Sequence, residues 1–147
     1  MKTFIFKVNL LDDKKIVREI EVLESANLYK LAEAIVSAFD FDFDHAFGFF
    51  SEITADWRLT ESEKMYELFA DMKDQGIEPT GAKSVVKTKI SEVWKTVGDK
   101  MMMLFDYGDD WRFVVELVGF GEKSPKTKYP RVTKSTGKAP EQYPPCE

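Results

Sequence analysis

The chain of 147 residues is 44% hydrophobic, carries twelve phenylalanines and has a net charge of −5. A chain of this length suits one domain and buries roughly 70% of its unfolded surface, so its core needs no disulfide or metal. The single cysteine, Cys146, excludes an internal disulfide and a thiolate zinc site, which favours a reducing, cytoplasmic setting. The acidic balance argues against a generic polyanion binder. We expect no membrane contact, because no apolar run approaches the roughly 20 residues of a span.

The beginning of the chain predicts an antiparallel hairpin. Residues 2–10 alternate apolar and polar side chains, and residues 14–22 place Ile16, Ile20 and Val22 on one side of a strand. Strict alternation is typical of strands that bury one face. The pair Asp12 and Asp13 lies between the two segments and is a turn signal, so we expect the two strands to be neighbours in a sheet.

A helix and a third strand are expected next. Residues 25–39 begin with Ser25 and Asn27, each of which can cap a helix, and apolar residues then recur at helical spacing. The following stretch, FDFDFDHAFGF, places aromatic rings at odd positions and aspartates at even ones. Because a strand sends alternate side chains to opposite faces, we expect a loop over 40–43 and a strand over 44–51.

Two further helices are expected in the middle of the chain. Residues 60–72 begin with Thr60 and Glu63, which have the spacing of a capping box, and they carry an apolar stripe. Residues 91–97 predict a shorter helix that ends at Gly98. The segment between these two helices shows no periodic pattern.

The most apolar part of the chain predicts two neighbouring strands. Residues 100–107 are apolar on both faces, which is typical of a central strand covered on both sides. Residues 111–120 are the natural partner strand. Gly108, Asp109 and Asp110 then form a short hairpin connection between them.

The last segment, residues 121–147, has a different composition, with five of the six prolines of the chain. We expect it to be extended chain on the surface, in part disordered. Together these elements predict one α+β domain over residues 1–147. Its antiparallel-rich sheet would have about five strands, with two or three helices packed on one side.

The segment VGDKMMMLFDYGDDWRFVVELV resembles the plasmid Ri ORF-3-like family. Members carry an aromatic-Asp-aromatic-Gly-Asp-x-Trp hairpin with a Gly-Asp pair upstream. The matching residues here are Gly98, Asp99, Phe105, Asp106, Tyr107, Gly108, Asp109 and Trp111, with Asp110 at the variable position. The first helix with its aspartate-rich strand, and the tail YPRVTKSTGKAPEQYP, also resemble the family, so the match reaches nearly the whole chain.

The resemblance implies an α+β fold and no characterised activity. Some relatives are described as passengers of insertion sequences or as resolvase-like, which links the family to mobile elements through genomic neighbourhood. Many members carry a histidine two positions after the hairpin tryptophan, where this chain has Phe113. A metal or acid–base role that depends on that histidine therefore lacks its residue here.

The carboxylates of the hairpin allow two interpretations. Asp106, Asp109 and Asp110 could bind a divalent cation, since hard cations take oxygen ligands. In the commoner arrangement, aspartates accept bonds from backbone N–H groups two residues on, and Gly108 adopts a positive φ. We favour this turn chemistry. We expect Asp106 to bond to its own turn or to a cation such as Arg112, because an unpaired carboxylate is costly to bury.

A second polar group precedes the third strand. Asp42, Asp44 and His45 could supply metal ligands, whereas a solvated acidic loop with a half-buried histidine is the simpler interpretation. His45 is the only histidine of the chain, so no second nitrogen ligand exists. A metal-assisted hydrolase would need these residues to meet Asp106 and Asp109 around one cleft.

Other features favour binding over catalysis. No serine lies in a nucleophile elbow, and no glycine-rich phosphate loop occurs. Seven aromatic residues could line a pocket but are more typical of a core: Phe39, Phe41, Phe43, Phe47, Phe49, Trp57 and Trp111.

Six basic residues of the tail could contact nucleic-acid phosphates, with Tyr129 and Tyr143 stacking on bases. They are Lys123, Lys126, Lys128, Arg131, Lys134 and Lys138. A solvated segment that offsets the acidic body is the simpler interpretation. We therefore expect a non-enzymatic binding module for a protein or nucleic-acid partner, without a cofactor, and keep the metal-assisted hydrolase as the alternative.

Overall fold

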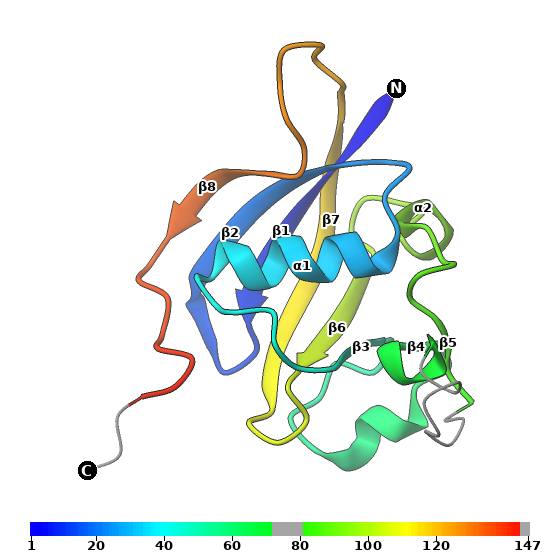
Figure 1. Cartoon of the computed structure of the whole chain (residues 1–147), viewed down its shortest axis with the longest axis vertical. Coiled ribbons are helices and arrows are strands. Elements are labelled where there is room, and N and C mark those ends of the chain that lie inside the picture. The colour runs from blue at the N-terminus through cyan, green and yellow to red at the C-terminus, as the bar shows by residue number, and fades with distance from the viewer. Residues whose placement is uncertain (72–80, 145–147) are drawn as a thin grey trace.

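The computed structural model describes residues 1–71 and 81–144, in which eight strands form one mixed sheet (Figure 1). The strands are β1 (Lys2–Leu10), β2 (Asp13–Leu23), β3 (Phe47–Phe50), β4 (Met65–Glu67), β5 (Lys83–Ser84), β6 (Lys100–Phe105), β7 (Trp111–Glu122) and β8 (Arg131–Thr136). Their order is β5-β4-β3-β6-β7-β1-β2-β8, and only the β4–β5 pair is parallel. The helices are α1 (Leu28–Ala38) and α2 (Ile90–Val93), with 3-10 turns η1 (Trp57–Glu61) and η2 (Leu68–Asp71). No helix in the described residues is long and apolar enough to cross a bilayer.

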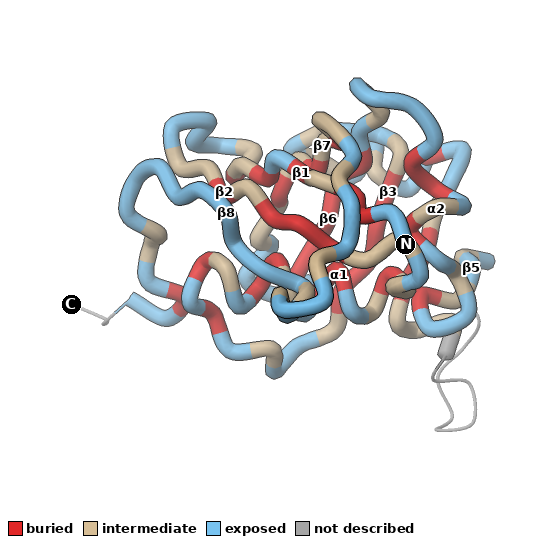
Figure 2. Tube along the Cα trace, turned by 90° about the horizontal axis from the view of Figure 1, so that it is seen from above, coloured by how far each residue is buried: buried red, intermediate tan, exposed pale blue. Residues whose placement is uncertain are grey.

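One face of the sheet is covered by α1. The helix begins after Asn27, whose side chain accepts a bond from the Lys30 N–H at 2.8 Å. Its buried side chains join the core with one face of the central strands: Leu28, Leu31, Ala32, Ile35 and Val36 with Phe4, Phe6, Val8, Phe113, Val115 and Leu117. Figure 2 shows these buried segments beside an exposed β8. The helix expected over 25–39 and the hairpin of 2–10 with 14–22 are confirmed.

The face away from α1 carries charged side chains in register. Across five strands each residue stands opposite the next, with basic and acidic residues alternating: Lys100, Glu116, Lys7, Glu19 and Lys134. Opposite charges on directly facing positions stabilise a sheet. This row keeps the uncovered face hydrated, and it explains why the strands alternate between apolar and charged residues.

The expected fold class is wrong in its proportions. The sequence predicts about five strands and two or three helices, whereas the described residues contain eight strands, one helix of 11 residues and one of four. β4 and β5 have three and two residues, too few for a periodicity to show. All six residues of β8 are exposed, so no apolar alternation marks that strand. The α+β expectation is therefore replaced by a sheet-dominated fold with one full helix.

The helix expected over 60–72 does not form in the described part of that segment. The hydroxyl of Thr60 donates to a carbonyl within η1 at 2.9 Å instead of capping a helix. The chain then becomes β4, in which Tyr66 pairs with Phe49 on β3. Pairing with a buried strand outweighs the local helix signal here. The last residue of the expected helix lies outside the described residues.

The helix expected over 91–97 is shortened to α2. Trp94 leaves the helical conformation, and its buried indole N–H donates to the Val115 carbonyl at 3.2 Å. The Asp99 side chain then accepts two backbone N–H bonds. Gly98 has a φ of 103° and belongs to the turn that leads into β6, so it does not end a helix as expected.

Candidate functional site

The hairpin between β6 and β7 is held by the side chain of Asp106. Its Oδ1 accepts hydrogen bonds from the N–H groups of Gly108 at 3.1 Å and Asp109 at 3.2 Å. Its carbonyl accepts from the Asp110 N–H at 2.6 Å. The expected turn chemistry is present, with one correction: the positive φ lies at Asp106 (63°) and Asp110 (59°), and not at Gly108. Aspartate tolerates this conformation because its short side chain can bond locally.

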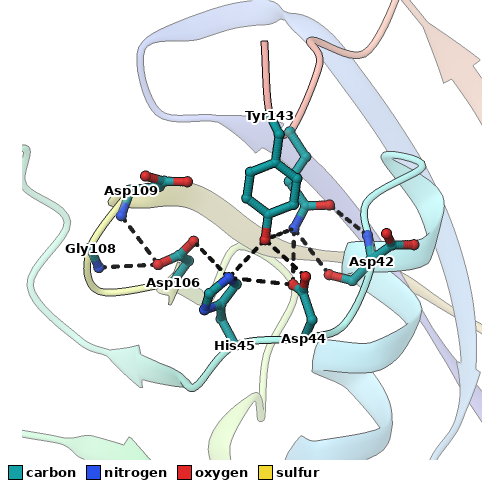
Figure 3. Close-up of polar contacts among 8 residues, drawn as sticks. Asp42, Asp44, His45, Asp106, Gly108, Asp109 and Tyr143 are labelled. Atoms are coloured by element: carbon teal, nitrogen blue, oxygen red, sulfur yellow. Dashed lines mark hydrogen bonds and ion pairs between the residues drawn. The ribbon is translucent and has the colours of Figure 1, made fainter. Parts of the chain in front are cut away.

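Asp106 also brings the hairpin to His45. Because β3 and β6 are paired, the residues before β3 lie against the residues after β6, and the Asp106 N–H donates to the Ala46 carbonyl at 2.9 Å. The second carboxylate oxygen, Oδ2, lies 3.4 Å from His45 Nε2. Arg112, the expected cation, bonds instead to Asp110 at 2.7 Å and to two backbone carbonyls. The two polar groups of the sequence therefore converge (Figure 3).

The C-terminal segment adds Gln142 and Tyr143 to this site. His45 Nε2 lies 2.7 Å from the Tyr143 phenol oxygen, which lies 2.9 Å from Asp44 Oδ2. The Gln142 amide accepts from the Asp42 N–H at 2.7 Å, and it donates to the Asp42 carbonyl at 3.1 Å and to Asp44 at 3.2 Å. We call this group the His45 site: Asp44, His45, Asp106, Gln142 and Tyr143 (Figure 3).

The hydrogen-bond roles in the His45 site follow from the single phenol hydrogen. Tyr143 donates this hydrogen to Asp44, so its oxygen accepts from His45, which places a proton on Nε2. Partial desolvation and the bond to Asp44, with the charges of Asp44, Asp106 and Asp109, raise the pKa of Tyr143 to about 12. The phenol therefore stays neutral and remains a donor at physiological pH.

The His45 site brings together three of the five proposed ligand side chains. Asp44, His45 and Asp106 meet, whereas Asp42 and Asp109 contribute backbone groups. Within residues 1–71 and 81–144, no group of three or more His, Cys, Asp or Glu side chains is placed to hold a metal ion. The geometry instead ties three distant segments together through hydrogen bonds. The sequence pattern did not identify Gln142 or Tyr143 as members, because an extended tail gives no sign of where it docks.

Two aromatic residues of the hairpin motif pack on other parts of the fold. The phenol of Tyr107 donates to the Glu67 carboxylate on β4, and burial strongly raises the pKa of Tyr107. Trp111 packs edge-on against Phe41, with ring centroids 4.7 Å apart. Most of the other aromatic candidates belong to the core, as expected: Phe39, Phe47 and Phe49 are buried, Phe43 is partly buried, and Trp57 is 67% exposed.

The six basic residues of the tail are all exposed, but they differ in whether an acidic side chain lies next to them. Lys123, Lys126 and Lys128 lie on the loop that projects beyond the sheet between β7 and β8 (Figure 1). Arg131 forms an ion pair with Glu21, with Nη2 and Oε1 2.7 Å apart. Lys134 stands opposite Glu19 in the charged row, and Lys138 follows the end of β8.

A groove lies between α1 and β8. Its volume is about 440 Å³, and it is lined by Ile20, Glu33, Ala34, Ser37, Ala38, Pro130, Arg131 and Val132. The walls are mainly apolar, with Glu33 and Arg131 as the charged residues. The groove therefore runs beside the outermost strand on the face that α1 covers.

Comparison with known proteins gives a family and a fold. The family model of the plasmid pRiA4b ORF-3-like protein matches residues 2–143. A solved structure with a similar fold is that of MM3350, a protein of unknown function from Methanosarcina mazei Go1. The two are 20% identical with a TM-score of 0.72, and the match covers 94% of this chain and 71% of that one. None of the curated proteins compared with the chain matches it. The chain therefore belongs to the plasmid pRiA4b ORF-3-like family.

Proposed function

We propose that the chain is a non-enzymatic binding module that takes up an extended, acidic segment of a partner protein at the free edge of β8. The observation that carries this proposal is the place of β8 in the sheet. β8 is the last strand, with β2 on one side and no other strand of the described chain on the other. All six of its residues are exposed.

An edge strand points unpaired backbone N–H and C=O groups outward, so an extended peptide can join the sheet as a further strand. β8 also has features that oppose pairing with a copy of itself. Pro130 precedes it, Thr133 is an extra residue where the register with β2 shifts, and Lys134 adds charge. The proline and the extra residue shorten the stretch that is open to any added strand, and the positive charge disfavours a second basic strand and favours an acidic one.

The groove beside β8 supplies a place for a side chain of the added strand. Because side chains alternate between the faces of a strand, every second one would point toward α1. Ala34, Ala38 and Val132 offer apolar contact there, and Val132 is 46% exposed. An apolar residue between two acidic ones therefore fits this edge.

The charges of the tail favour a protein segment over nucleic acid. Lys128, Lys134 and Lys138 lie along or near β8, and they complement acidic side chains on a neighbouring strand. Affinity for a phosphate backbone grows with the number of cations that are free to neutralise phosphates. Here Arg131 is paired with Glu21, which lowers that number.

The proposal is tested by fluorescence anisotropy with a labelled peptide of alternating glutamate and valine. A lysine–valine peptide controls for charge, and single-stranded and duplex oligonucleotides test the nucleic-acid alternative at about 50 and 200 mM salt. We expect the acidic peptide to bind, with amide shifts in the NMR spectrum confined to β8 and the groove-facing side of α1. Stronger binding of oligonucleotides, or shifts elsewhere, would contradict the proposal.

Two variants locate the site, and one serves as a control. Ser37→Trp fills the groove from an exposed position of α1. The double variant Lys134→Glu with Lys138→Glu reverses charge beside the edge and should weaken peptide binding roughly fivefold or more. The control Lys83→Glu with Lys87→Glu makes the same charge change at two exposed positions in and next to β5, on the opposite edge, and should leave binding unchanged.

A further inference from the structure

A second hollow lies on the face of the sheet that α1 does not cover. Its volume is about 620 Å³, within the range of small-molecule sites. Four side chains make an apolar floor: Phe50, Leu59, Met65 and Leu104. The polar part of the lining comes from the hairpin, from β4, from β7 and from η1: Thr60, Glu67, Tyr107, Asp110 and Arg112.

A buried carboxylate stands at the wall of this hollow. Glu67 is 8% exposed and accepts a hydrogen bond from the Tyr107 phenol. Within the described chain, no basic side chain forms an ion pair with it. Burial of a carboxylate without a counter-cation is unfavourable, and a single phenol bond compensates only part of that cost.

The backbone at Gly48 leaves room for the contact between Glu67 and Tyr107. Gly48 on β3 stands opposite Glu67. A Cβ at position 48 would lie 2.9 Å from both Glu67 Cγ and the Tyr107 phenol oxygen. The absence of a side chain at position 48 leaves the space in which the carboxylate and the phenol meet. The pair is thus positioned by three parts of the backbone: β3, β4 and the hairpin.

Arg112 is the only basic residue of the lining among residues 1–71 and 81–144, and it is already engaged. Arg112 bonds to Asp110 at 2.7 Å and to the carbonyls of Thr54 at 2.6 Å and Asp56 at 2.9 Å. The Arg112–Asp110 pair is neutral as a unit, so the lining keeps the negative charge of Glu67. The Tyr107 ring, part of a residue that is 37% exposed, adds an aromatic surface beside that charge.

From this geometry we infer that the hollow binds a small primary ammonium ion that carries an apolar body. The ammonium group would donate to the Glu67 carboxylate and lie near the electron-rich face of Tyr107. The apolar body would rest on Phe50 and Leu104. This site is distinct from the edge of β8, so the two proposals can fail independently.

The test uses 2-phenylethylammonium as the probe and 2-phenylethanol as a neutral control of nearly the same shape. Calorimetry and NMR titration should give one site for the ammonium, with shifts at Gly48, Glu67, Leu104 and Tyr107, and much weaker binding of the alcohol. Equal binding of both compounds would mean apolar adsorption only and would overturn the inference. So would the absence of binding up to the solubility limit, or shifts outside the hollow.

Three variants separate the buried charge from general acidity. Glu67→Gln keeps an acceptor for Tyr107 and should weaken ammonium binding about tenfold or more, because it removes a negative charge with which no basic side chain of the described residues pairs. Glu63→Gln removes an exposed carboxylate nearby and should have no effect. Thr60→Lys, at an exposed position of the lining, places a tethered ammonium near the hollow and should compete with the probe even if Glu67→Gln fails to fold. Unchanged binding in both Glu67→Gln and Thr60→Lys would refute the assignment.

Discussion

Replacing Asp106 by alanine should lower the free energy of unfolding by about 2–4 kcal/mol. The variant loses an acceptor for two backbone N–H groups, those of Gly108 and Asp109. A typical hydrogen bond contributes about 1 kcal/mol to stability, and one to a charged acceptor contributes about 1.5 kcal/mol or more. Alanine must also hold the φ of 63° at this position, which costs about another 1 kcal/mol. Urea unfolding at pH 7, followed by tryptophan fluorescence, measures the difference.

Two companion variants make this prediction specific. Asp109→Ala removes an exposed neighbour whose backbone, not its side chain, bonds to Asp106, so it should change stability by less than about 0.5 kcal/mol. Asp106→Asn keeps an acceptor oxygen and tolerates the positive φ, so its loss should lie between the other two. If Asp106→Ala and Asp109→Ala were equally mild, the turn would not depend on this carboxylate.

Other variants address the remaining contacts. Gly48→Ala should destabilise the fold by about 1–3 kcal/mol in urea unfolding, because the new Cβ would lie 2.9 Å from Glu67 Cγ. The pKa of Glu21 is lowered in the folded state despite the raising effect of its desolvation, because the hydrogen bond from Thr3 and the pairing with Arg131 outweigh it. Ionised Glu21 therefore stabilises the folded state above the unfolded pKa of about 4.5, and this stabilisation is lost as the pH falls through the lower folded pKa. Arg131→Gln should make the free energy of unfolding depend less on pH in this acidic range, as urea unfolding at several pH values would measure. Tyr143→Phe removes the bond to Asp44 and should speed hydrogen exchange of the amides beside the His45 site. A matched Tyr129→Phe removes the acceptor of the Ser124 N–H, so it should affect the loop between β7 and β8 and leave the amides beside the His45 site unchanged. Addition of Mg²⁺, Mn²⁺ or Zn²⁺ should leave the melting temperature unchanged, and a clear rise would restore the metal-site interpretation.

Periodicity predicted the parts of the fold in which one face of an element is buried. β1, β2, β7 and α1 follow the expected segments because their apolar residues recur at the period of the element that buries them. The pattern fails where burial does not select the side chains. β8 is exposed along its length, and the capping pair at Thr60 and Glu63 gives a helix signal that pairing of β4 with β3 overrides.

The convergence of the His45 site could not be deduced from local sequence. It depends on the register of β3 with β6, where Phe47 stands opposite Phe105. That register puts Ala46 beside Asp106, and it therefore brings the preceding residue, His45, next to the Asp106 carboxylate. The residues before β3 and after β6 are some 60 positions apart, so only the sheet order brings their charges together. A list of acidic segments contains no information about this register.

The hairpin motif has a structural explanation in which each residue serves a different part of the fold. Asp106 closes the turn and faces His45 on the side of the covered core. Tyr107, the next residue, bonds to Glu67 beside the hollow on the uncovered face. Because neighbouring residues of one turn serve the two faces, a change in the turn should disturb both sites at once. NMR shifts in Asp106→Ala should therefore extend to the amides of Gly48 and Glu67, whereas shifts limited to the His45 site would show that the two faces are independent.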